Sequence, residues 1–299
     1  MAQQYIWLDG KFVKFDDAKV HVLTHGMQYG TGIFEGIRAF KTGKGSAIFR
    51  LKDHVRRFFD SAKIHDMKLE LSPGETEDAI ASTVKKNGFA ECYIRPFAFY
   101  NDTRLGVSPM GRRVSIAIAA ISWGSYFEKE AGLRCEVSSW ERINSRVLPP
   151  MAKASGNYLN SALASVDARK AGFDEAIMLS NGYVAEGPGE NIFLVESGVL
   201  VTPSKESDIL MGITRDSVIK IAETLGIEVE ERFVHREELY TCDELFFTGT
   251  AASIVPIVEV DLRKVGNGKG GPITKLLNER YVKVVHGEDN SFSSWLAYV

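Results

Sequence analysis

The chain has 299 residues, of which 44% are hydrophobic and 25% are charged, so it can bury a substantial core and has a length typical of about two domains. Its formal net charge is -3, with 36 basic and 39 acidic residues spread along the chain, so no extended basic surface indicates a nucleic-acid or membrane partner. The expected ligand is therefore a small molecule.

The first residues, MAQQYIWLDGKFVKFDD, lack the basic stretch and apolar run of a secretory signal, and no later segment is long and apolar enough to span a bilayer. The 3 cysteines, Cys92, Cys135 and Cys242, lie far apart in apolar or strand-like sequence, which predicts reduced, buried thiols. The 6 histidines show no metal-ligand spacing. We therefore expect a cytoplasmic protein without a metal site.

The first part of the chain mixes strand and helix patterns. The segments AIFRL and CYIRPFAFY have the apolar and aromatic composition of strands, and VSIAIAAI, residues 114–121, predicts a buried strand that closes this part. A helix is predicted between the first two strands because apolar residues recur on one of its faces, namely Leu51, Val55, Phe58, Phe59 and Ala62.

A connector is predicted at residues 123–132, which are rich in small, aromatic and charged side chains. It separates a small N-terminal domain, residues 1–122, from a larger C-terminal domain, residues 133–299. The second domain begins afresh with the strand LRCEVSSW. It contains predicted helices from about Gly156 to Ala171 and from about Arg215 to Leu225, and Thr214 is predicted to cap the latter.

A hairpin is predicted between these helices. The strands EAIMLS and YVAEG are separated by Asn181 and Gly182, and Asn-Gly accepts the positive φ angles of a type I′ turn. GENIFLV and GVLVTP add two further strands. Strands followed by helices in both parts indicate an α+β chain rather than a regular βαβ repeat.

Two residues could carry covalent and acid–base chemistry. Lys153 follows two prolines and precedes a predicted helix, where a fixed backbone and the positive helix end favour a neutral, nucleophilic amine. Glu186 ends a predicted hairpin strand, where its carboxylate could pair with a protonated ring nitrogen. In isolation, a solvated loop lysine and a turn glutamate facing water are the commoner interpretations.

Other residues could bind a phosphate. Arg57 lies beside the apolar stripe of the first helix and either anchors phosphate or belongs to a solvated basic face. Ile213 and Thr214 start a predicted helix, whose unpaired amides attract anions, although simple capping is the alternative. In FFTGTAAS, the small residues Gly249 and Thr250 follow a buried strand and could also bind an anion.

Taken together, several segments resemble the branched-chain aminotransferases of the fold type IV pyridoxal-phosphate enzymes. In chain order they are HGMQYGTGIFEGIRAF, CYIRPF, MAKASGNYLNS, NGYVAEGPGENIF, GITRD and TGTAAS. The likeness runs from YIWLDG to the final SSWLAYV. It implies a small α/β domain, a larger pseudo-barrel domain, and pyridoxal 5'-phosphate held where the two meet. It also implies a homodimer or a higher assembly, in which each pocket takes residues from the neighbouring subunit.

The resemblance assigns roles to individual residues. Lys153 is implied to be the Schiff-base lysine and proton shuttle, and Glu186 to be the partner of the pyridine nitrogen. Tyr158 would face the phenolic oxygen of the cofactor. The implied phosphate site consists of Arg57, Ile213, Thr214, Gly249 and Thr250.

The resemblance also implies an apolar pocket that favours isobutyl and isopropyl side chains. Its edge would accept the charged side chain of glutamate through Tyr29 and Arg95, and Leu105 and Val107 would come from a loop of the other subunit. The implied substrate residues are Tyr29, Phe34, Gly36, Arg38, Tyr93, Arg95, Leu105, Val107, Trp123, Tyr126, Thr250 and Ala251.

The implied activity is transamination of leucine, isoleucine and valine with 2-oxoglutarate. D-amino acid aminotransferases, (R)-amine transaminases and aminodeoxychorismate lyase share the lysine, glutamate and phosphate site but differ at the pocket. Tyr29, GIFEGIRAF and YIRP follow the branched-chain pattern. A protein that binds pyridoxal phosphate without turnover is expected to lack Lys153 or Glu186, and both are present.

Overall fold

A computed structural model describes residues 4–122 and 132–299, and contacts between Cα atoms divide the chain into two compact units. The first comprises Met1–Gly124, Ala152–Gly156 and Val284–Val299, and the second comprises Ser125–Met151 and Asn157–Lys283. This division differs from the predicted domains because residues 152–156 and 284–299 lie in the first unit. Both segments pair with its strands over long distances in sequence, as in the bridge between Ala154 and Ile33, and local patterns do not reveal such pairing.

The first unit contains an 8-stranded sheet whose pairings are antiparallel. The strand order is β17-β5-β4-β6-β7-β1-β2, and β3 also pairs with β6. The strands are β1 (Tyr5–Leu8), β2 (Lys11–Lys14), β3 (Gly32–Phe34), β4 (Ile37–Thr42), β5 (Gly45–Phe49), β6 (Cys92–Tyr100), β7 (Val114–Ile121) and β17 (Leu296–Tyr298). The helical segments are η1 (Phe15–Asp17), α1 (His25–Tyr29), α2 (Leu51–Ile64), α3 (Pro73–Asn87) and η4 (Asn290–Trp295).

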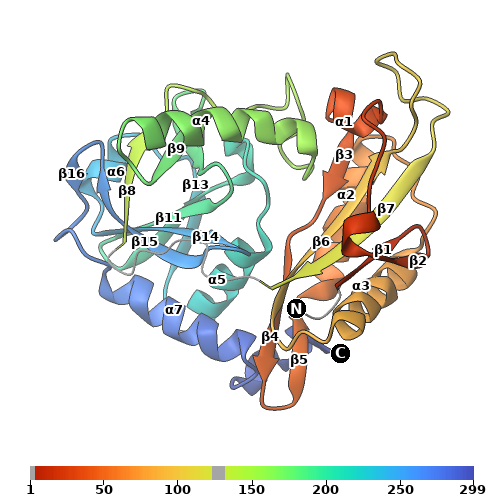
Figure 1. Ribbon diagram of the computed structural model, residues 1–299. Coiled ribbons are helices and arrows are strands. Elements are labelled where there is room, and N and C mark those ends of the chain that lie inside the picture. The colour runs from red at the N-terminus through yellow and green to blue at the C-terminus, as the bar shows by residue number, and fades with distance from the viewer. Residues whose placement is uncertain (1–3, 123–131) are drawn as a thin grey trace. The chain divides into compact units, whose positions relative to one another are not determined.

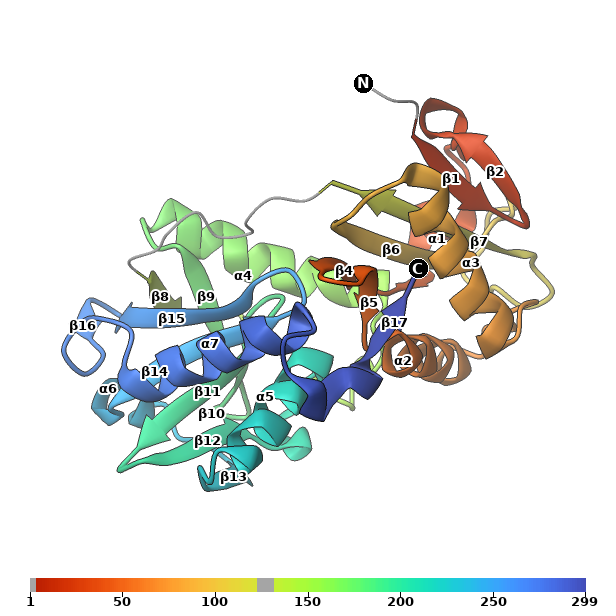
Figure 2. The same cartoon turned by 90° about the horizontal axis from the view of Figure 1, so that it is seen from below.

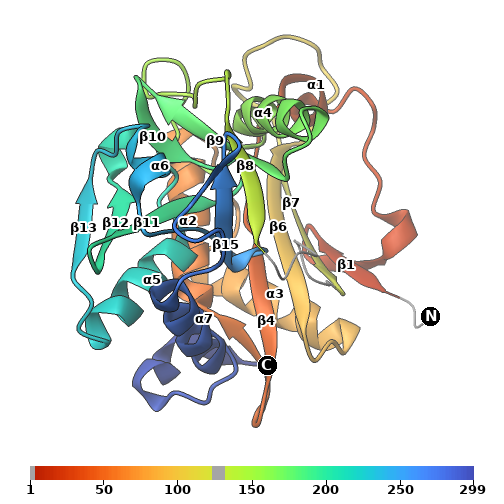
Figure 3. The same ribbon diagram turned by 90° about the vertical axis from the view of Figure 1, so that its left-hand side faces the viewer.

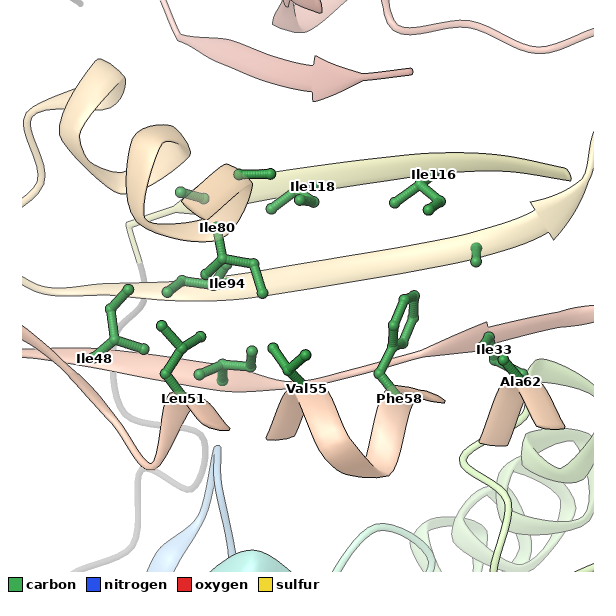
Figure 4. Close-up of a cluster of buried hydrophobic side chains, with 14 of the residues drawn as sticks. Ile33, Ile48, Leu51, Val55, Phe58, Ala62, Ile80, Ile94, Ile116 and Ile118 are labelled. Carbon is green, nitrogen blue, oxygen red and sulfur yellow. The ribbon is translucent and has the colours of Figure 1, made fainter. Parts of the chain in front are cut away.

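Helices α2 and α3 contact each other and cover one face of this sheet (Figures 1 and 2). Leu51, Val55 and Phe58 point from α2 toward the strands, as Figure 4 shows, so the predicted apolar stripe is confirmed. Phe59, which the stripe included, is half-buried at the edge of the same cluster. Burial of this cluster removes apolar surface from water and fixes α2 against the sheet.

The second unit contains a 9-stranded mixed sheet with the order β10-β9-β8-β15-β14-β11-β12-β13, and β16 pairs with β15. Its strands are β8 (Leu133–Val137), β9 (Glu175–Ser180), β10 (Tyr183–Glu186), β11 (Asn191–Glu196), β12 (Val199–Pro203), β13 (Val229–Arg232), β14 (Glu244–Gly249), β15 (Ser253–Val260) and β16 (Arg263–Lys264). The sheet curls on itself (Figure 3), because the Val184 amide in β10 donates to the carbonyl of Val234, just after β13, at 2.8 Å. The predicted pseudo-barrel and the α+β class are confirmed.

The helical segments of the second unit are η2 (Ser155–Asn157), which begins in the first unit, α4 (Tyr158–Lys170), η3 (Lys205–Ser207), α5 (Ile213–Thr224), α6 (Glu238–Thr241) and α7 (Pro272–Val285), whose last two residues belong to the first unit. Helix α4 packs on β9, and α5 packs on β13 and β14. Both predicted helices are confirmed, but the predicted cap at Thr214 is wrong. Helix α5 begins earlier than predicted, so Gly212 is its N-cap and Thr214 lies inside the first turn.

The predicted hairpin between β9 and β10 is confirmed. Asn181 and Gly182 have φ angles of 50° and 83°, as a type I′ turn requires. The cysteines Cys92, Cys135 and Cys242 are buried thiols, as predicted, and burial raises the pKa of Cys92 to about 12. Within residues 4–122 and 132–299, no helix is long and apolar enough to cross a membrane.

Candidate functional site

Several predicted substrate residues share one face of the sheet in the first unit. In β6, Ile94 points into the core beneath α2 and α3, so its neighbours Tyr93 and Arg95 project from the opposite face. Arg38 lies directly opposite Tyr93 in the paired strand β4 and therefore shares its face. The guanidinium of Arg95 stands 4.5 Å from the ring centroid of Phe34. The strand pairing thus brings the predicted residues together.

The phenol of Tyr93 is fixed on this face. Its hydroxyl oxygen accepts a hydrogen bond from Arg95 Nη2 at 2.9 Å. A Cβ atom at Gly36 would overlap this hydroxyl, so a larger residue at that position would force the phenol to move. Arg38, which was predicted to contact substrate, donates to Glu91 at 2.5 Å. Arg38 therefore has a structural role in this ion pair, in addition to the predicted contact with substrate.

Lys153 belongs to the first unit and is held by its backbone. Its amide donates to Ser61 Oγ at 3.0 Å, and its carbonyl accepts from the amide of Phe34 at 3.0 Å. The side chain is half-buried, and Nζ lies 5.1 Å from the ring centroid of Phe34. Lys153 is therefore not a freely solvated loop lysine, and it is placed beside the face that carries Tyr93 and Arg95.

Arg57 forms part of a buried ionic network. Its Nε and Nη2 donate to the two oxygens of Glu35 at 2.7 and 2.8 Å, and Nδ1 of His54 donates to the same carboxylate at 2.7 Å. Burial acts to raise the pKa of Glu35, but the charge of Arg57 and the hydrogen bonds from Arg57 and His54 lower this pKa well below its usual range. Burial lowers the pKa of His54, which favours the neutral form of its ring. Arg57 is therefore not part of a solvated basic face.

The sequence reasoning missed Glu35 and His54. A signal for both exists, because His54 and Arg57 are three residues apart and share one face of α2, and Glu35 lies inside the motif GIFEGIRAF. The contact of Glu35 with α2 depends on how β3 and the helix pack.

In the second unit, Glu186 ends β10 with only 4% of its surface exposed. Its Oε1 accepts from Arg142 Nε at 2.7 Å, and its Oε2 accepts from Asn191 Nδ2 and the Leu210 amide, both at 3.0 Å. The ion pair with a buried guanidinium stabilises the carboxylate in its charged form. Glu186 is thus not a turn glutamate facing water, and Arg142 and Asn191 are further residues that the sequence reasoning missed.

Asn191 also connects Glu186 to the start of α5. Its Nδ2 donates to the carbonyl of Leu210 at 2.9 Å, shortly before the helix begins. The N-cap of α5, Gly212, offers no side-chain hydrogen bond, so the amides of the first turn, where Thr214 lies, have no side-chain cap. Such a helix start suits an anion.

The turn after β14 adjoins this group. Asn191 pairs with Thr248 of β14, and the predicted residues Gly249, Thr250 and Ala251 follow directly. Arg142 Nη1 and Thr248 Oγ1 are buried and have no hydrogen-bond partner among the described residues. Buried polar groups are usually hydrogen-bonded, so both are available to bind a ligand. Tyr158 is half-buried at the first residue of α4. The second unit therefore gathers its predicted carboxylate and phosphate-binding residues around one buried network.

A loop of the first unit presents Leu105 and Val107 to the outside, with 65% and 77% of their surfaces exposed. Between them, the Gly106 amide donates to Tyr29 Oη at 3.1 Å, and its carbonyl accepts from His25 Nε2 at 3.0 Å. Two apolar side chains are thus held outward by a fixed loop tip. The predicted pocket residues Trp123 and Tyr126 lie outside the described residues.

Comparison with known proteins decides the family. The family model for amino-transferase class IV matches residues 32–260 of the chain. The chain belongs to this family. The resemblance inferred from the motifs is therefore confirmed at the level of the family.

Individual class IV aminotransferases resemble the chain over nearly its whole length. The branched-chain-amino-acid aminotransferase of Escherichia coli (strain K12) is 45% identical over 99% of this chain and 97% of its own. A crystal structure of the Escherichia coli enzyme has a TM-score of 0.96 at 44% identity and covers 98% of each chain. A T.th. branched-chain amino acid aminotransferase complexed with N-(5'-phosphopyridoxyl)-L-glutamate also has a TM-score of 0.96, at 46% identity, covering 100% of this chain and 99% of the other.

Proposed function

We propose that this class IV aminotransferase uses pyridoxal 5'-phosphate to transfer the amino group of branched-chain L-amino acids to 2-oxoglutarate, giving branched-chain 2-oxo acids and L-glutamate. The observation that carries the proposal is the agreement in sequence and fold, over nearly the full length of both chains, with branched-chain aminotransferases. The relative complexed with a phosphopyridoxyl-glutamate supports both the cofactor and the amino-group acceptor.

The described residues fit the cofactor. A buried, ion-paired carboxylate at Glu186 suits a protonated ring nitrogen, and the uncapped start of α5 suits a phosphate. When bound, pyridoxal phosphate supplies an aldehyde that receives the amino group and a ring that withdraws electrons from the substrate α-carbon. We propose as cofactor contacts Lys153, Glu186, Arg57, Tyr158, Ile213, Thr214, Gly249 and Thr250.

Several of these residues have a defined task in the proposal. Nζ of Lys153, as a free amine, would take the proton from the substrate α-carbon and deliver it to the aldehyde carbon of the cofactor. The Glu186 carboxylate keeps a proton on the ring nitrogen. Arg57 in the first unit and the amides of the first turn of α5 in the second are each suited to a phosphate, and a fixed phosphate fixes the geometry of proton transfer.

The substrate residues remain those that the family pattern implies. Phe34, Tyr93 and Arg95 lie on one sheet face near Lys153, which supports a substrate site there. The aromatic and apolar side chains favour branched aliphatic substrates, and the cation of Arg95 suits the side-chain carboxylate of glutamate. We extend the proposal to Tyr29, Gly36, Arg38, Trp123, Tyr126, Thr250 and Ala251.

We also propose a homodimer or an assembly of dimers, in which Leu105 and Val107 enter the pocket of a second copy. The exposure of both side chains on a fixed loop tip supports this, because neighbouring exposed apolar side chains can form part of a protein–protein interface. Sedimentation of the wild type and of Val107→Asp would test it, since a charge at the tip should weaken association. We further propose a cytoplasmic location, which the buried thiols suit.

The activity is tested by the absorption spectrum of the reconstituted protein before and after adding L-leucine, D-alanine or (R)-1-phenylethylamine, each without a keto acid. We expect L-leucine alone to change the absorption of the bound cofactor. Bleaching by D-alanine or the amine but not by L-leucine would contradict the substrate assignment. Absence of a cofactor band would contradict the whole proposal.

Lys153→Ala should abolish this response and turnover while the fold stays intact. Lys205→Ala is the matched control, because Lys205 is a surface lysine with 65% of its side chain exposed. Wild-type turnover in the Lys153 variant would contradict the assignment.

A further inference from the structure

Lys153 and Arg57 are joined by a hydrogen-bonded path through one hydroxyl. The amide of Lys153 donates to Ser61 Oγ at 3.0 Å, and this hydroxyl donates to the carbonyl of Arg57 at 2.9 Å. Ser61 is fully buried, so water does not compete for either bond. The backbone of the lysine is thus tied to the backbone of the arginine.

A second path joins the carbonyl of Lys153 to the guanidinium of Arg57. The carbonyl of Lys153 accepts from the amide of Phe34 at 3.0 Å, and the next residue, Glu35, holds the guanidinium of Arg57 by two hydrogen bonds of 2.7 and 2.8 Å. Glu35 is fully buried and also accepts from His54. The two paths close a ring that includes the backbone of Lys153 and the side chain of Arg57.

We propose that Glu35 and Ser61 are positioning residues that set the separation between Lys153 and the Arg57 guanidinium, and so determine how well one ligand can engage both. The inference rests on the proposed function, in which Lys153 meets an aldehyde and Arg57 a phosphate. A ligand that carries both groups binds tightly only when the two contacts can form together, because the second contact is then intramolecular.

The charge of Glu35 makes this role testable, because charge and position predict opposite effects. Glu35 neutralises Arg57 and therefore weakens its attraction for a phosphate. If Arg57 acted only as a positive charge, removing the charge of Glu35 would strengthen phosphate binding. If Glu35 fixes the guanidinium, its removal weakens a ligand that must reach Lys153 as well.

The first experiment uses Ser61→Ala, which removes two hydrogen bonds without changing a charge. The apoprotein is titrated with pyridoxal phosphate, with pyridoxal, which has the aldehyde only, and with inorganic phosphate. Thr83→Val is the control, because Thr83 is buried on α3 and donates to the carbonyl of Ala79 at 2.7 Å, the same kind of bond within a helix.

For Ser61→Ala we expect the affinity for pyridoxal phosphate to fall about tenfold, the equivalent of about 1.4 kcal/mol, while the affinities for pyridoxal and phosphate stay within about twofold. Thr83→Val should bind all three ligands as the wild type does. Equal weakening of all three ligands in Ser61→Ala, or no change in any of them, would overturn the proposal.

The second experiment uses Glu35→Gln, with Glu244→Gln as control. Glu244 is a buried carboxylate that accepts from the amides of Ile273 and Thr274 at 2.9 and 2.7 Å, so its loss tests the general effect of removing a buried charge. We expect Glu35→Gln to bind pyridoxal phosphate more weakly and inorganic phosphate no more weakly than the wild type. Tighter binding of pyridoxal phosphate would overturn the positioning role.

Failure of the proposed function has a different signature. If the wild type itself does not bind pyridoxal phosphate, both the proposed function and the positioning role are wrong. If the wild type binds it and responds to L-leucine while Ser61→Ala and Glu35→Gln bind it with unchanged affinity, only the positioning role is wrong.

Discussion

His54 should make the stability of the protein fall as the solution becomes acidic. In the folded state its pKa is lowered, first by burial, while in the unfolded chain it keeps its ordinary value of 6.5. The unfolded state therefore binds more protons at pH values below this, and the free energy of unfolding decreases as pH falls through 6.5. His54→Asn removes this group but keeps an N–H that can reach Glu35.

The size of the effect follows from the titration of the unfolded chain. If the folded ring stays neutral throughout, lowering the pH from about 7.5 to about 5.5 costs about 1.4 kcal/mol, one factor of ten in proton binding. Glu35 does not titrate in this range, because its pKa is lowered further below the ordinary 4.5 of a glutamate.

The assay is urea denaturation of the apoprotein at both pH values, for the wild type and for His54→Asn. The difference between the two proteins cancels the contributions of the other histidines, including His65, whose pKa is also lowered by burial. We expect the wild type to lose about 1.4 kcal/mol relative to the variant on acidification. An unchanged difference between the two proteins would refute the assignment of a neutral, buried His54.

Three substitutions test other parts of the structure. Gly36→Ala places a methyl group against the hydroxyl of Tyr93, so we expect the free energy of unfolding to fall by about 1–3 kcal/mol in denaturation experiments. We also expect a raised KM in steady-state kinetics, and an unaltered KM would contradict the contact. Arg142→Met leaves Glu186 as a buried charge without its ion-pair partner, so the free energy of unfolding should fall by about 3–5 kcal/mol. An unchanged denaturation midpoint would argue against the ion pair. Gly182→Ala strains a residue with φ of 83° and should lower stability by about 1 kcal/mol while kcat stays the same; altered kcat would show that the turn affects the site.

Local patterns were sufficient for parts of the fold. The apolar stripe of α2 and the Asn-Gly turn between β9 and β10 were both predicted, because each depends on residues only a few positions apart. Helix α3 was not predicted, although Ser72 and Glu75 form a capping box at its start. That signal was available in the sequence and was overlooked.

Long-range pairing could not be predicted in the same way. The segment around Lys153 joins the first unit because Ala154 pairs with Ile33 and the Lys153 carbonyl accepts from Phe34. The sequence between them contains several elements, and no periodicity within it indicates this contact. The predicted domains were therefore continuous stretches of sequence, whereas the first unit of the structure also includes distant segments that pair with its strands.

The candidate site shows the same distinction. Arg57 and Glu186 were proposed from motifs, while their partners Glu35 and Arg142 were missed, because these contacts span 22 and 44 residues. The motifs indicated the residues proposed to face a ligand. The residue that balances the charge of each lies far away in the sequence, so it can be identified only from the three-dimensional packing of the elements.

The missed partners explain how each unit can fold with a charged group inside it. A buried charge without a counter-charge costs several kcal/mol, so neither Arg57 nor Glu186 could be buried alone. Glu35 balances Arg57 within the first unit, and Arg142 balances Glu186 within the second. Neither unit therefore needs the charges of a cofactor to stabilise its fold. The guanidinium and the carboxylate are already oriented when a phosphate or a ring nitrogen arrives, so little reorganisation opposes binding.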